Sequence, residues 1–118
     1  MKSLENILDE FAGKTNLQLE EHLKSAIGSE VEVLGEVNGI HANPDMIILS
    51  DAVPDRLNAS VTILYDREQF RQELLAYSRL DNVRLTMRLT RVDFAAPNHY
   101  WFDLTSIRRL ETDQQYRR

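Results

Sequence analysis

Apolar residues recur at helical spacing in two short segments within residues 1–29, and each segment is followed by a glycine. At the start of the first segment, Ser3 has the side chain of a typical N-cap residue. Thr15 and Gln18 form a capping-box pattern at the start of the second segment. We therefore expect two short amphipathic helices, which need an apolar surface to pack on. Their apolar positions are Leu4, Ile7, Leu8, Phe11, Leu19, Leu23, Ala26 and Ile27.

From residue 30 onward, apolar and polar residues alternate in the way that is typical of β-strands. Gly35 interrupts the first alternating segment, and a glycine inside a strand often marks a bulge or a sharp bend. Helical spacing returns once, over residues 67–80, with Asp66 as a candidate N-cap. The pattern predicts five strands, over residues 30–40, 46–51, 60–66, 82–94 and 100–110.

The order of these elements, three strands, one helix and two strands, resembles the OB-fold, a Greek-key barrel with its helix between strands three and four. The segments "VEVLGEVNGI", "VTILYD" and "VRLTMRLTRVD" carry the resemblance, which points in particular to small bacterial domains described as tRNA-anticodon-binding-like. It covers residues 30–110, about two thirds of the chain. We expect a mainly β domain with added helices: a five-stranded barrel, a helical extension over residues 1–29 packed on it, and a frayed tail over residues 111–118.

Charge is unevenly divided along the chain. Residues 1–58 contain four basic and eleven acidic residues, whereas residues 59–118 contain ten arginines and eight acidic residues. The whole chain has a net charge of −5, and an acidic protein repels a polyanion at long range, although a local basic patch can still bind one. We expect opposite charges from the two halves to meet on the folded surface.

A row of arginines lies in the fourth predicted strand. Alternation places Arg84 and Arg88 on its outer face. The OB-fold resemblance implies that this strand lies antiparallel to the first, whose outward positions include Glu30, Glu32 and Glu36. We favour structural cross-strand charge pairs over a strip that binds nucleic acid. The inward side chains of the same strand are Val83, Leu85, Met87 and Leu89.

A site for single-stranded nucleic acid needs aromatic rings for stacking and cations along the path of the strand. The resemblance implies that such a site uses the outer face of strands two and three, whose only aromatic residue, Tyr65, is expected in the core. A smaller candidate site combines Arg56, Arg91, His99 and Trp101, because Arg91 follows a shift in the alternation and is expected to stay unpaired. Trp101 points outward if its neighbours point inward; alternatively, it packs beneath the N-terminal helices.

Catalytic and metal-binding motifs do not stand out in the sequence. The chain has no cysteine, its three histidines lack metal-binding spacing, and no phosphate-binding loop or nucleophile motif occurs. We therefore expect a non-enzyme without a metal or cofactor. No cluster of polar residues in the sequence supports the binding of a small ligand in the mouth of the barrel. No signal peptide or membrane-spanning stretch is predicted, so we expect a cytoplasmic location and no membrane contact.

Two functions stay open. The first is a protein-interaction module, acting as an adaptor or a stoichiometric inhibitor on a protein partner, or as a homo-oligomer. The two extra helices and the acidic N-terminal half favour it. The second is a single-stranded DNA- or RNA-binding protein, which the resemblance and the arginine-rich second half favour. We favour the first.

Overall fold

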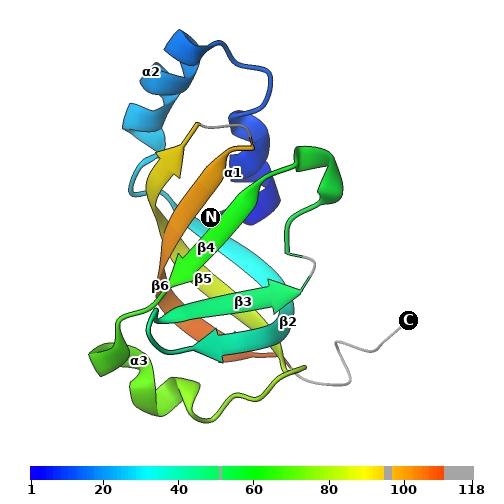
Figure 1. Cartoon of the computed structure of the whole chain (residues 1–118), viewed down its shortest axis with the longest axis vertical. Coiled ribbons are helices and arrows are strands. Elements are labelled where there is room, and N and C mark those ends of the chain that lie inside the picture. The colour runs from blue at the N-terminus through cyan, green and yellow to red at the C-terminus, as the bar shows by residue number, and fades with distance from the viewer. Residues whose placement is uncertain (51, 95–96, 111–118) are drawn as a thin grey trace.

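The computed structural model describes residues 1–50, 52–94 and 97–110, so the predicted tail over residues 111–118 lies outside the described residues. Figure 1 shows a β-barrel with the two N-terminal helices at one end and the third helix at the other. In chain order the elements are β1 (Lys2–Ser3), α1 (Leu4–Glu10), α2 (Asn16–Ala26), β2 (Glu30–His41), β3 (Met46–Ser50), the 3-10 helix η1 (Asp55–Leu57), β4 (Ser60–Leu64), α3 (Arg67–Leu74), β5 (Asn82–Asp93) and β6 (His99–Arg109).

Five of the strands form one closed barrel. β2, β3 and β4 are successive antiparallel neighbours, β6 pairs parallel with β4, and β5 pairs antiparallel with both β6 and β2. α3 lies between β4 and β5 in the chain, which are the third and fourth strands of the barrel. The structure is therefore a five-stranded mixed barrel consistent with an OB-like fold, and the predicted fold class is confirmed.

The seams of the barrel differ in length. The ladder between β5 and β6 runs from the pair Val83–Arg109 to the pair Asp93–His99. Among the described residues, β3 and β4 pair only over residues 46–47 of β3 and 63–64 of β4. β4 is therefore joined to the barrel mainly through its parallel ladder with β6.

β2 bends where it changes partners. Its residues 30–36 pair with β5, and its residues 36–41 pair with β3. Gly35 lies at this change, and a Cβ atom there would come within 3.1 Å of Leu49 Cδ1 on β3, so the lack of a side chain permits the close approach. The irregularity in the ladder itself lies between Val37 and Gly39, two residues beyond the predicted position.

The core fills the barrel and extends under α1. All four predicted inward residues of β5 are fully buried, as is Phe102 on β6. Leu4, Ile7 and Leu8 of α1 belong to the same buried cluster. Burial of a side chain of this size contributes about 1.5–3 kcal/mol. The amphipathic first helix thus finds its apolar surface at the end of the barrel.

Side-chain caps fix where α1, α2 and α3 begin. The Ser3 side chain accepts a hydrogen bond from the backbone of Asn6, and Thr15 and Gln18 form the expected reciprocal capping box. At α3, the Asp66 side chain accepts from the backbone N–H of Gln69 at 3.2 Å. The three predicted N-caps are confirmed.

α3 ends at Leu74, six residues earlier than its spacing predicts. The backbone N–H of Ser78 donates to the carboxylate of Asp81, and that of Leu80 donates to the carbonyl of Val37 on β2. In a longer helix these two N–H groups would donate to the carbonyls one turn earlier, so the contact of Leu80 with the barrel and that of Ser78 with Asp81 replace helical hydrogen bonds after residue 74. Tyr77 consequently lies outside the helix.

Two short elements were not predicted. Lys2 and Ser3 pair parallel with Val31 and Glu32 as the short strand β1, and η1 forms within the predicted loop over residues 52–59. Within the described part of the chain, no helix has the length and apolar character needed to cross a membrane.

Candidate functional site

An aromatic and cationic cluster occupies the outer face of the barrel on β5 and β6. Because side chains alternate along β6, Tyr100 and Phe102 enter the core while His99 and Trp101 lie on the outside. The His99 and Trp101 rings are stacked, with centroids 4.0 Å apart and planes inclined by 22°. Arg91 lies opposite Trp101 on β5, and its Cζ atom is 4.3 Å from the Trp101 ring centroid. We call Arg91, His99 and Trp101 the Trp101 cluster.

Neighbouring hydroxyl groups hold the Trp101 cluster in place. Thr62 on β4 lies opposite Trp101, and its Oγ1 atom is 2.6 Å from His99 Nε2. Thr90 donates its hydroxyl hydrogen to the backbone carbonyl of Trp101 at 3.1 Å. The ladder and these two bonds therefore preset the stacked arrangement. Trp101 and His99 are partly exposed and Arg91 is exposed, so the cluster presents an ordered, amphipathic surface.

Tyr100, and not Trp101, lies beneath the N-terminal helices. Phe11 at the end of α1 makes edge contact with Tyr100, with ring centroids 5.4 Å apart, and also contacts Phe94 and His22. Trp101 is not among the described residues that form the core or pack against it. The position beneath the N-terminal helices, which was the alternative for Trp101, is therefore occupied by Tyr100.

Arg56 does not join the Trp101 cluster. It lies in η1, where Nη1 donates to Asp9 Oδ1 at 3.0 Å and Nη2 donates to Glu5 Oε2 at 2.6 Å. These contacts tie η1 to α1. The hydrogen bond from Arg56 holds the pKa of Asp9 below its usual value, and the two carboxylates raise the pKa of Arg56 further. Of the four predicted site residues, the structure brings three together.

The arginine row faces acidic residues across the seam between β2 and β5. Arg88 lies directly opposite Glu30, with Nη2 3.8 Å from Oε1, and it lies opposite Asp103 on its other neighbouring strand. Arg84 Nε is 3.6 Å from Glu32 Oε2 in a diagonal contact.

Glu36, the third acidic residue expected to face the arginines, does not lie opposite one. The register places Glu36 opposite Asn82. The reason is that Glu36 already lies at the bend where β2 begins to pair with β3, which is beyond the arginine row.

The sequence predicts the grouping of Arg91, His99 and Trp101, but not its position beside the third strand of the barrel. β6 runs parallel to β4, the third barrel strand, which sets Trp101 beside Thr62 on the outer face. The parallel neighbour of the third strand follows from the OB-like order of strands, so this position could have been inferred.

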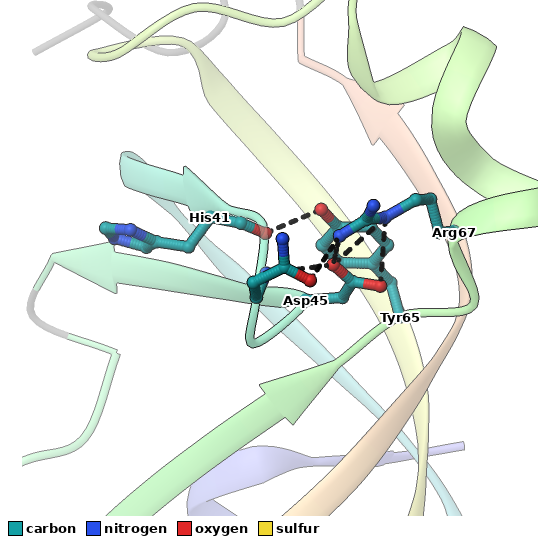
Figure 2. A network of polar contacts seen from close by, with 5 residues as sticks. His41, Asp45, Tyr65 and Arg67 are labelled. Carbon is teal, nitrogen blue, oxygen red and sulfur yellow. Dashed lines mark hydrogen bonds and ion pairs between the residues drawn. The ribbon is translucent and has the colours of Figure 1, made fainter.

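Tyr65, predicted to be in the core, is partly buried and packs against the core, and its hydroxyl belongs to a polar network at the other end of the barrel. Its hydroxyl donates to the backbone carbonyl of His41 at 2.6 Å. Arg67 Nε donates to the carboxylate of Asp45 at 3.2 Å, and its Nη2 atom donates to Asn43 Oδ1 at 3.1 Å. Figure 2 shows that these contacts join the turn between β2 and β3 to the start of α3. Sequence reasoning assigned no role to Arg67.

Metal-ligating side chains do not gather in the part of the chain that the structure describes. No group of three or more histidine, aspartate or glutamate side chains there could hold a metal ion.

No protein-family model and no curated protein matches this chain. The likeness to OB-fold proteins therefore rests on the barrel itself: its order of strands, its closure between β2 and β5, and the position of α3.

Proposed function

We propose that this chain is a non-enzymatic binding module that acts through protein–protein contact, with the Trp101 cluster as the centre of its interface. The observation that carries the proposal is the position of Trp101, which is partly exposed and stacked against His99 and Arg91 on the outside of a closed barrel. Tryptophan and arginine are the residues most enriched at the energetic centres of protein interfaces. A role as an adaptor or a stoichiometric inhibitor fits this arrangement.

Charge supports a protein partner over a polyanion. The chain has a net charge of −5, and five of the eight arginines that the structure describes outside the cluster are paired with carboxylates. The arginines in ion pairs are Arg56, Arg67, Arg84, Arg88 and Arg109.

Single-stranded nucleic acid is the second candidate, and one observation favours it. The Trp101 cluster borders β4, and in OB-folds the outer face of the second and third strands commonly binds oligonucleotides. Two stackable rings and a guanidinium are the groups that such binding uses. If the chain binds nucleic acid, we propose that it is one of the tRNA-anticodon-binding-like domains. Under either function we propose a cytoplasmic location.

The test of the first candidate is affinity purification from the native host with the full chain and matched variants. We expect a protein partner to be retained by the unchanged chain and by Leu17→Ala, which alters an exposed apolar residue on α2. Trp101→Ala should weaken that complex by about thirtyfold or more, the loss typical of an interface hot spot. A partner retained equally by Trp101→Ala would refute the proposed interface.

The lone tryptophan also reports on the second candidate, because any base stacked on it changes its fluorescence. Under the protein-binding proposal, single-stranded DNA and RNA leave the emission of Trp101 unchanged at low salt. A saturable change that weakens with added salt and disappears in Arg91→Ala would reverse the ranking of the two candidates.

A further inference from the structure

A hollow of about 340 Å³ lies between α3 and the end of β2, at the opposite end of the barrel from α1. Its volume lies within the range of small-molecule sites, about 300–1,000 Å³. Most of its lining is apolar or aromatic, and the polar groups are concentrated on two arginines of α3. We call it the α3 hollow; it is lined by Ile40, His41, Ala42, Tyr65, Arg67, Arg71, Leu74, Leu75 and Tyr77.

One wall of the α3 hollow is held by the polar network of Figure 2. Tyr65 is fixed by its hydrogen bond to the carbonyl of His41, and Arg67 is fixed by Asp45 and Asn43. A wall whose side chains already have partners keeps its shape without a ligand, and such preformed walls are typical of binding sites.

The facing wall is also held by contacts outside the hollow. The guanidinium of Arg109 lies over the ring of Tyr77, with Cζ 4.8 Å from the centroid. Arg109 Nη2 in turn donates to the carbonyl of Ala76 at 2.7 Å and to the carboxylate of Asp81 at 3.0 Å. Both tyrosine rings of the hollow are therefore held by interactions that a ligand does not need to supply.

The charge of the lining is opposite to that of the protein. None of the nine lining residues is acidic, although the chain as a whole has a net charge of −5. Asp45 neutralises Arg67, whose pKa it raises. Among the described residues, Arg71, one helical turn further along α3, forms no ion pair, so its charge is available.

We propose that the α3 hollow binds a carboxylate attached to a small apolar group, with the anion on Arg71 and the apolar group against Leu74, Tyr77 and Ile40. One available guanidinium matches one negative charge, and its planar fork accepts a carboxylate in two parallel hydrogen bonds. The phenols of Tyr65 and Tyr77 do not oppose the anion, because a phenol with its ordinary pKa of about 10 is neutral at pH 7 and burial raises the pKa of both further.

A small organic acid and the C-terminus of a peptide both present this chemistry. The site shares no residue with the Trp101 cluster, so the proposal stands or falls separately from the protein-binding function. Arg67 and Arg71 supply polar groups at this end of the barrel, which the sequence alone did not indicate.

The test is a titration of the full chain, isotopically labelled, followed by the amide chemical shifts. The probes are phenylacetate with its neutral amide, and a short peptide ending in phenylalanine with a free or an amidated C-terminus. We expect phenylacetate or the free peptide to give saturable shifts at Ile40, Leu74 and Tyr77 and none at Trp101. The neutral counterpart should bind at least about tenfold more weakly. The acid that binds identifies the source of the carboxylate.

Two arginine variants separate a specific site from a general charge effect. Arg71→Gln should weaken binding at least about tenfold, whereas Arg79→Gln, which removes an exposed arginine outside the hollow, should leave it unchanged. Both arginines are exposed, so neither variant removes core packing. No saturable shift with either acid, equal binding of acid and amide, or equal binding by the two variants would each overturn the proposal.

Discussion

Arg88 faces Glu30 directly across the seam that closes the barrel, with Nη2 3.8 Å from Oε1. Arg84 reaches Glu32 from a diagonal position, with Nε 3.6 Å from Oε2, which is an ion pair longer than a hydrogen bond. The two arginines thus compensate charges on the outside of the closing strands. Within β5, the arginine that lies against an aromatic ring is Arg91, beyond the register shift in this strand.

Breaking the ion pairs of this seam should cost little stability. In a double-mutant cycle of Glu32→Gln and Arg84→Gln, followed by urea unfolding, we expect a coupling of about 0.2–1 kcal/mol. Both side chains are about two-fifths exposed, so water screens their attraction. A coupling above about 2 kcal/mol would contradict this account, since exposed pairs do not reach that value.

The barrel core should be sensitive to lost volume. Leu85→Ala removes a fully buried side chain from β5 and should lower the free energy of unfolding by about 2–5 kcal/mol. The matched control is Leu34→Ala on the adjacent strand β2, where the side chain is 53% exposed. Its expected effect lies within about 0.5 kcal/mol. Equal losses of unfolding free energy in the two variants would contradict the assignment of Leu85 to the core.

The capping box of α2 gives a third prediction. Thr15→Ala removes the oxygen that accepts from the backbone of Gln18 and should cost about 1 kcal/mol of unfolding free energy. Thr15→Ser keeps the hydroxyl and should retain most of the stability. Thermal unfolding followed by circular dichroism measures both, and an Ala variant as stable as the Ser variant would show that the cap contributes nothing.

Acid should loosen the contact between η1 and α1. The hydrogen bond from Arg56 lowers the pKa of Asp9 in the folded state, so its contribution to stability is present above the unfolded pKa and is lost as the pH falls through the folded one, below about pH 4. In Arg56→Gln, the pKa of Asp9 should rise toward its usual value, as measured by a carboxyl NMR titration. Arg79→Gln, which leaves this contact intact, should not change it.

Much of the fold could be predicted from local patterns. The alternation in β5 identifies its buried face, and Ser3, Thr15 and Asp66 identify the starts of the helices, because these signals depend on near neighbours in the chain. The end of α3 could not be predicted in this way. It depends on the hydrogen bond between Leu80 and Val37, which are far apart in the sequence.

The candidate site was only partly predictable for the same reason. Alternation places His99 and Trp101 on one face of β6, and the proximity of Arg91 follows from the adjoining strand. The partners of Arg56 lie on α1, 47 and 51 positions away, and no local pattern links them. Likewise, the α3 hollow combines residues of β2, α3 and the segment after it, which only the closed barrel brings together.

We expect the barrel to open first at the short ladder between β3 and β4. Local opening is favoured where few backbone hydrogen bonds need to break, and among the described residues the ladder between β3 and β4 is the shortest seam of the barrel. If this seam opens, β4 stays paired with β6, so the contact between Thr62 on β4 and His99 on β6 is kept. Amide hydrogen exchange should therefore be faster at this seam than in the β5–β6 hairpin, while the stacked rings of the Trp101 cluster keep their arrangement.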